Sequence, residues 1–301
     1  MMRRYFKGYE PGYHFWTAYL FILPALAIYG VFVFWPILQT VRYSLFEWNG
    51  LDTPQFVGFS NYVDLYHDEI FRVAFQNNLT FILFYTAFPI IIALFLTAIL
   101  TRRKIFGLTF FRAGLFLPYV MSMVVVGVVW RWIYNPIFGP LNEFLEMVGL
   151  ESWKRAWLGD FDLALPAVGV IGTWVQYGFC LVLFIAGVQR IEEELYDAAK
   201  IDGANEFRQL WHITLPALRS EIAVAMVTTL ISALRVFDLV YVTTRGLPGN
   251  KTMVVSFHLY QNAFEQHKVG YAASIAVTLT SVILFISFLI IQWRKRVEEN
   301  V

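Results

Sequence analysis

Residues 163–189 read LALPAVGVIGTWVQYGFCLVLFIAGVQ and contain no charged side chain. An α-helix needs roughly 17–25 mostly apolar residues to cross the hydrocarbon core of a bilayer. The one proline of this stretch, Pro166, lies near its edge. Membrane helices tolerate proline because neighbouring groups satisfy the carbonyls that it frees. The stretch therefore predicts a transmembrane helix.

Five further runs of the chain share this apolar character. The 301-residue chain is 58% hydrophobic and only 15% charged, whereas soluble domains are about a quarter charged. Its mean hydropathy is +0.57. We predict an all-α polytopic membrane protein with one transmembrane domain over 15–301 and a short tail over 1–14. The five other predicted spans are 15–41, 73–101, 113–130, 222–244 and 269–293.

The first run, 15–41, is predicted to be a retained span. It is too long for the apolar core of a signal peptide and lacks a convincing small-residue cleavage site. The fifth run, 222–244, is interrupted by two charges, Arg235 and Asp238.

The lysines and arginines predict the direction of the six spans. Fourteen of them fall in the two tails and the second and fourth connections, and eight fall in the other three connections. Because cytoplasmic loops carry the excess of Lys and Arg, we expect both termini in the cytoplasm. The connection 190–217, which we name the coupling segment, is then cytoplasmic as well.

Several functional classes lack their motifs in this chain. No Walker A, HExxH or GxSxG pattern occurs, and the phosphate-loop lookalike at 249–252 lacks the glycine before its lysine. We therefore expect no catalytic residue, no metal site and no ATP bound by this chain through that motif.

The single cysteine, Cys180, excludes an internal disulfide and is predicted to pack as a small apolar residue. The N-x-T matches at Asn78 and Asn250 are short enough to arise by chance. A net charge of +1 gives no reason to expect a nucleic-acid partner.

The coupling segment is polar yet helical in pattern. Residues 194–216 read ELYDAAKIDGANEFRQLWHITLP. Gly203 can take the left-handed conformation that ends a first helix. A second helix is expected to end near Leu215, because Pro216 disfavours the helical conformation in the residue before it. That short helix carries apolar residues on one side. It could dock into a groove of another protein or lie on lipid headgroups, and periodicity alone leaves both open.

Three motifs in this segment resemble the EAA loop of ATP-binding-cassette importer permeases. They are Tyr196-Asp197-Ala198-Ala199, Ile201-Asp202-Gly203-Ala204 and Ile213-Thr214-Leu215-Pro216. The glycine and the I-x-L-P match the family in type and spacing, while Asp197 replaces the usual glutamate with a shorter carboxylate. The resemblance implies that an ATPase is contacted by Asp197, Ala198, Ala199, Asp202, Gly203, Phe207, Leu210, Trp211, Ile213, Leu215 and Pro216.

Other motifs extend the resemblance to the maltose-type sugar permeases over nearly the whole chain. They include 116–118 through Trp130, 139–142, 237–244 and 270–274. One departure is Arg245 and Leu247, which stand where the family often has T-x-G-G-P. The resemblance implies half of a translocation channel for a sugar or polyol-like solute in a prokaryotic inner membrane. It also implies a second related permease, two cytoplasmic ATPase subunits that hold ATP and Mg²⁺, and an extracytoplasmic solute-binding protein.

Polar side chains at membrane depth are the candidates for a solute path, because such groups usually face a bundle interior or an aqueous cavity. The fifth span carries Ser232, Arg235 and Asp238 on one helical stripe. The fourth offers Trp174, Gln176 and Tyr177, and the sixth offers Ser274 and Thr278. Each set has a structural alternative: pairing of Arg235 and Asp238 with each other or with the partner permease, interhelical hydrogen bonding by Gln176 with ordinary packing of the rings of Trp174 and Tyr177, and helix packing by the hydroxyl stripe.

Two other functional classes are the alternatives to an importer. An ion-coupled secondary transporter could use Arg235 and Asp238, although the chain shows no detectable inverted repeat. A membrane-embedded enzyme would need a nucleophile or metal constellation, which the sequence does not offer.

Overall fold

The computed structural model describes residues 15–102 and 107–299, and these are almost entirely helical. The predicted tail 1–14 and the basic residues Arg103 and Lys104 lie outside the described residues. The helices are α1 (Phe15–Tyr29), α2 (Trp35–Tyr43), α3 (Ser60–His67), α4 (Glu69–Ile82), α5 (Phe88–Arg102), α6 (Leu108–Val120), α7 (Met123–Ile133), α8 (Pro140–Met147), α9 (Ala164–Val188), α10 (Glu193–Ile201), α11 (Glu206–Gln209), α12 (Leu215–Ala217), α13 (Arg219–Leu234), α14 (Asp238–Thr243), α15 (Val255–Tyr260) and α16 (Val269–Glu299).

Short irregular turns join several of these helices. π-helical turns cover Gly30–Phe34, Leu83–Ala87, Leu210–Thr214 and Gln261–Glu265, and a 3₁₀ turn covers Glu151–Trp153. The described strand content is one small antiparallel hairpin, in which β1 (Phe46–Glu47) pairs with β2 (Gln55–Phe56). The all-α prediction is thus confirmed, apart from this hairpin in the first connection.

Five helical stretches of the described chain are long and apolar enough to cross a membrane. They are Tyr19–Tyr43, Glu69–Leu100, Ala164–Val188, Arg219–Thr243 and Val269–Gln292. The third predicted span is different, because its two helices, Phe110–Val120 and Met123–Ile133, meet at an angle of 96°. When this bent pair is counted as one span, the chain has six.

The bend corrects the expectation of one continuous helix over 113–130. Met121 and Ser122 adopt extended backbone conformations between α6 and α7. Hydropathy gives no sign of this break, because the apolar run continues through it on both sides. After the bend, α7 packs closely against α14: a Cβ on Gly127 would lie 3.0 Å from the side chain of Val242.

The fifth predicted span is also interrupted. The helical turns stop at Leu234 and resume at Asp238, so residues 235–237 are not helical. Non-helical backbone at membrane depth is tolerated where it is buried in protein or lines a cavity. The predicted stripe of polar residues along one continuous helix is therefore wrong in its geometry.

The core forms where α9 packs against the second span. A Cβ on Gly169 would overlap the ring of Phe84, and a Cβ on Gly172 would overlap the ring of Tyr85. Glycine at these two positions lets the aromatic rings lie directly on the α9 backbone. Cys180 is fully buried in the same helix, which confirms its predicted packing role.

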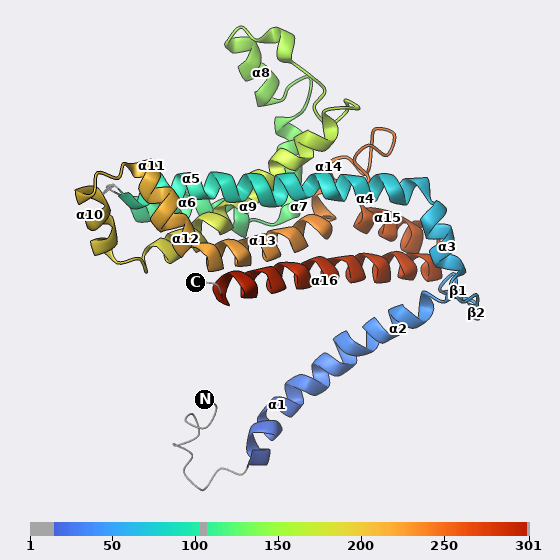
Figure 1. Ribbon diagram of the computed structural model, residues 1–301. Coiled ribbons are helices and arrows are strands. Elements are labelled where there is room, and N and C mark those ends of the chain that lie inside the picture. Colours follow the sequence, from blue (N-terminus) through green and yellow to red (C-terminus); the bar gives the residue numbers. More distant parts are fainter. Residues whose placement is uncertain (1–14, 103–106, 300–301) are drawn as a thin grey trace.

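Figure 1 shows how the elements are distributed along the bundle. Helices α10 and α11 lie at one end, and the C-terminal part of α16 extends toward that end. The β1–β2 hairpin and α3 lie at the opposite end. Helices α1 and α2 diverge from the bundle, and α8 belongs to a unit that projects from its side (Figure 1). The two ends of the bundle thus carry different elements.

Candidate functional site

The coupling segment folds as two helical pieces joined at a glycine. Helix α10 ends at Ile201, and Gly203 follows with a φ of +77° and open space around its Cα. Asn205 then caps α11, because its side-chain oxygen accepts a hydrogen bond of 2.9 Å from the Arg208 N–H. The predicted turn at Gly203 is therefore present, and a short capped helix follows it.

The second helical piece continues further than the sequence predicts. Instead of stopping near Leu215, it widens into the π-helical turn 210–214 and passes through Pro216 to Ala217. The Leu215 N–H bonds to the carbonyl of Leu210, five residues back. Pro216 then stands in the first turn of α12, where a missing N–H and a fixed φ are tolerated.

Two large aromatic side chains form the exposed face of this piece. Phe207 and Trp211 are 70% and 60% exposed, and their rings stack with centroids 6.3 Å apart. Asp197, Ala198, Asp202 and Gly203 are exposed as well, whereas Ala199, Leu210, Ile213, Leu215 and Pro216 are half-buried. The carboxylate of Asp197 pairs with Lys200 at 2.9 Å. The aromatic pair is thus the largest apolar feature of the segment that is available to a partner.

The two pieces of the coupling segment are joined to each other, and the residue that follows them is buried in the bundle. The hydroxyls of Tyr196 and Thr214 lie 2.9 Å apart and join the two helical pieces. Leu218, just after the segment, is fully buried in a cluster that contains Phe184 of α9. A Cβ on Gly187 would overlap the Leu218 side chain, so this side chain lies directly against the α9 backbone. A displacement of the segment would therefore be passed directly to α9 and α13.

The break in the fifth span opens onto a cavity of about 260 Å³, which we name the inner cavity. Its lining comes from the second, third, fourth and fifth spans: Tyr85, Met123, Gln176, Ile231, Ser232, Arg235, Val236, Phe237, Asp238 and Leu239. Four of the predicted path residues are brought together here, namely Gln176, Ser232, Arg235 and Asp238. Their polar groups provide an amide, a hydroxyl and two charges at one site.

Two structural alternatives, a hydrogen bond by the Gln176 side chain and an Arg235–Asp238 pair, are absent among the described residues. Gln176 is 3% exposed but makes no side-chain hydrogen bond to any other described residue. Arg235 and Asp238 do not form an ion pair in the described part of the chain. The Ser232 hydroxyl donates to the carbonyl of Thr228 at 3.1 Å and keeps its lone pairs free. The amide and the charges of the inner cavity are thus left available to a solute or a partner.

Four other predicted path residues do not line the inner cavity. Trp174 packs edge-on against Trp130 with ring centroids 5.7 Å apart, and Tyr177 and Thr278 are half-buried elsewhere. Ser274 is fully buried, and its hydroxyl donates to the carbonyl of Tyr271 at 2.7 Å. For Trp174 and Ser274 the packing alternative therefore describes the observed contacts.

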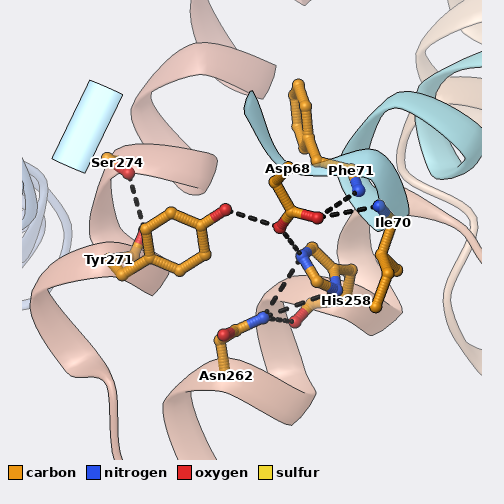
Figure 2. A network of polar contacts seen from close by, with 7 residues as sticks. All are labelled: Asp68, Ile70, Phe71, His258, Asn262, Tyr271 and Ser274. Carbon is orange, nitrogen blue, oxygen red and sulfur yellow. Dashed lines mark hydrogen bonds and ion pairs between the residues drawn. The ribbon is translucent and has the colours of Figure 1, made fainter. Parts of the chain in front are cut away.

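A polar network at the opposite end of the bundle was not foreseen from the sequence (Figure 2). Asp68 caps α4 through hydrogen bonds from the Ile70 and Phe71 N–H groups to its Oδ1. Its Oδ2 accepts from the Tyr271 hydroxyl at 2.6 Å and lies 2.8 Å from Nε2 of His258. The Asn262 amide in turn donates to the carbonyl of His258. Asp68 thus ties together α4, α15 and α16.

The network keeps Asp68 ionised. Burial raises the pKa of Asp68, but hydrogen bonds from Tyr271, the Phe71 N–H and His258 outweigh it and hold that pKa below its ordinary value. The network also forms one wall of an outer cavity of about 690 Å³. An aspartate directly before a helix is a known capping signal and could have identified Asp68. The partners from α15 and α16 are about 190 residues away in sequence and give no such signal.

Comparison with known protein families shows which family this chain belongs to. Residues 79–297 match the model of the family described as "Binding-protein-dependent transport system inner membrane component". The chain belongs to this family. It is therefore an inner-membrane component of a binding-protein-dependent transport system. The matched region contains the coupling segment and every lining residue of the inner cavity.

Relatives of this inner-membrane component span nearly its full length. It is 38% identical over 94% of its length, and 97% of the relative's, to the "Probable ABC transporter permease protein YurN" of Bacillus subtilis. It is 36% identical to the "Diacetylchitobiose uptake system permease protein NgcF" of Streptomyces coelicolor, over 88% of this chain and 78% of the other. It is 31% identical to the "Lactose transport system permease protein LacF" of Rhizobium radiobacter, over 91% and 92%.

Solved structures confirm the fold of the permease. A chain in the crystal structure of a bacterial ABC transporter that imports the acidic polysaccharide alginate superposes with a TM-score of 0.81. The match covers 93% of this chain and 96% of the other at 23% sequence identity. A second alginate transporter structure, in complex with a pentasaccharide-bound periplasmic protein, gives a TM-score of 0.82.

Proposed function

We propose that this permease forms half of the translocation channel of an ATP-driven importer for a sugar or polyol-like solute. Two relatives support the carbohydrate class, since they are named as permeases of a diacetylchitobiose uptake system and of a lactose transport system. A second related permease would complete the channel, and an extracytoplasmic binding protein would deliver the solute. Two cytoplasmic ATPase subunits would hold the ATP and Mg²⁺. Family membership and the unpaired Arg235 and Asp238 both argue against the ion-coupled alternative.

The observation that carries the coupling role is the exposed aromatic pair on an anchored segment. Phe207 and Trp211 offer stacked rings for a groove on an ATPase, and the burial of Leu218 links them to the bundle. Rigid-body closure of the ATPases would move this docked segment and reorient the spans. In this proposal both chain termini and the coupling segment lie in the cytoplasm, as the excess of Lys and Arg predicts.

The inner cavity is the proposed solute path. Amide, hydroxyl and charged groups from Gln176, Ser232 and Arg235 converge on it, and they suit the hydroxyl groups of a sugar. An intramembrane charge that faces a cavity is a functional candidate by default. The cavity volume is about that of one small ligand, and a second permease across the channel would enlarge the path.

The turn at Gly203 provides the test of coupling. Gly203→Pro forces φ to about −65° in place of the observed +77°. We expect it to abolish uptake and ATPase copurification while the permease still inserts. The matched control is Gly58→Pro, which alters another glycine of positive φ with open surroundings, in the first connection. Retained solute-stimulated ATPase activity in Gly203→Pro would contradict the proposal.

A further inference from the structure

Asn78 occupies the point where the second span meets the break in the fifth. It lies on α4 and is fully buried. Its side-chain nitrogen donates hydrogen bonds of 3.1 Å to the carbonyls of both Ala233 and Leu234. Its side-chain oxygen accepts a hydrogen bond of 2.9 Å from the Val255 N–H. The amide of Asn78 therefore joins the end of α13 to the start of α15.

Two of these groups, the carbonyls of Ala233 and Leu234, are left without partners by the broken span, and the third, the Val255 N–H, begins the separate helix α15. The last carbonyls and the first N–H groups of any helix have no intrahelical partner. Inside a membrane no bulk water is present to replace them. An asparagine side chain offers two N–H donors and a carbonyl acceptor, so one Asn78 satisfies two carbonyls of α13 and one N–H of α15. The residues that follow Leu234 are the non-helical ones that line the inner cavity.

We infer that Asn78 is a positioning residue, which holds the break at 235–237 open and keeps Arg235 and Asp238 at the inner cavity. Asn78 itself does not line that cavity. It acts through the backbone of Ala233 and Leu234, next to Arg235. The expected effect of Asn78 on uptake rests on the proposed solute path. Its expected effect on the conformation of residues 235–237 does not.

The neighbouring Asn77 provides a matched control on the same helix. It is 8% exposed, and its side-chain nitrogen also donates to two carbonyls, those of Lys251 and Met253, at 3.0 and 2.8 Å. Asn77 therefore holds the loop before α15 rather than the break in the fifth span. Two adjacent asparagines that each donate to two backbone carbonyls thus support two different segments.

Cysteine labelling can separate the two roles. In a Cys180→Ala background, Val236→Cys reports on the break and Met253→Cys reports on the loop; Val236 and Met253 are 6% and 3% exposed. A small methanethiosulfonate reagent is applied to the purified permease. We expect Asn78→Leu to speed labelling at 236 at least fivefold and to leave labelling at 253 within twofold. Asn77→Leu should show the reverse pattern.

Rescue and transport complete the test. Asn78→Gln keeps both donors on a longer stem, so we expect labelling at position 236 to return partly toward the wild-type rate. In the assembled importer, Asn78→Leu should raise the apparent KM for uptake without loss of ATPase copurification. Unchanged labelling at 236 in Asn78→Leu, or equal changes from both asparagine variants, would overturn the inference. Normal uptake in Arg235→Ala would count against the proposed path but would not affect the labelling result.

Discussion

The coupling segment and the inner cavity are built in different ways, and the difference shows which kind of site a sequence can reveal. The coupling segment lies within residues 190–217, and local rules build it: a glycine turn, an asparagine cap and an aromatic pair at helical spacing. The inner cavity takes its lining from four spans and exists because the fifth span is interrupted. Local chemistry therefore identifies the first site, and tertiary packing creates the second.

The largest expected effect is loss of the aromatic pair. Phe207→Ser together with Trp211→Ser removes both exposed rings, and buried aromatic anchors are each worth about 2 kcal/mol or more in an interface. We expect uptake to be abolished and the ATPase to be lost on copurification. Phe264→Ser is the control, because Phe264 is similarly exposed, at 67%, but lies in the connection before α16. If the double variant still copurified with its ATPase, the aromatic pair would not be the ATPase-binding feature of the coupling segment.

The next effect concerns the link between the segment and the bundle. Leu218→Ala removes a fully buried side chain from the cluster around Phe184 and should destabilise the permease by about 2–5 kcal/mol. We expect the ATPase still to bind while uptake falls, because the docked segment no longer moves the spans. Leu195→Ala is the control, since Leu195 is 52% exposed within the same segment. Thermal unfolding in detergent and uptake by proteoliposomes measure the two effects, and unchanged values for Leu218→Ala would contradict the link.

A smaller effect is expected at the inner cavity. Arg235→Ala should raise the apparent KM for uptake about tenfold, which corresponds to about 1.4 kcal/mol, and leave ATPase copurification intact. Thr278→Ala should change neither quantity, because Thr278 does not line the cavity. Initial uptake rates as a function of solute concentration, with the cognate binding protein present, measure the KM. An unchanged KM in Arg235→Ala would remove that residue from the proposed path.

The smallest effect is a pH dependence at the outer network, remote from both sites. Because the folded-state pKa of Asp68 is lowered, its contribution to stability is present above its unfolded pKa of about 4 and is lost as pH falls through the folded value. Asp68→Asn should lower the stability of the permease at neutral pH. It should also make stability depend less on pH below about pH 4. Thermal unfolding in detergent between about pH 3 and pH 7 measures this pH dependence. If the stability of the Asp68→Asn variant fell as steeply with decreasing pH as that of the wild type, the proposed role of Asp68 would be contradicted.

The sequence allows the helical class, the approximate spans and the coupling segment to be predicted, because each depends on local composition or on a few adjacent residues. The run 163–189 corresponds closely to α9, and Gly203 is the turn that its residue type indicates. The breaks after Val120 and Leu234 could not be predicted in this way. The first lies inside an apolar run. The second coincides with Arg235 and Asp238, but the groups that stabilise it come from Asn78, more than 150 residues away in sequence.

The dependence on tertiary packing also explains why only some of the predicted path residues line the inner cavity. Gln176, Ser232, Arg235 and Asp238 are polar at membrane depth, and the fourth and fifth spans bring them to one cavity. Trp174 and Ser274 satisfy the same sequence criterion, but their side chains pack against neighbours instead. Asn78 matches only a chance N-x-T pattern, although it makes three buried hydrogen bonds. Polarity within a span thus indicates a candidate, and the contacts decide its role.

Photocrosslinking from position 211 in living cells tests the coupling role most directly. Trp211 is replaced by p-benzoylphenylalanine, and the same replacement at Phe264 serves as the control. The proposal predicts a crosslink from position 211 to a cytoplasmic ATPase subunit and none from position 264. Crosslinks from position 211 to lipid alone, in cells that contain the ATPase, would instead show that the segment lies on the membrane surface and would contradict the coupling role.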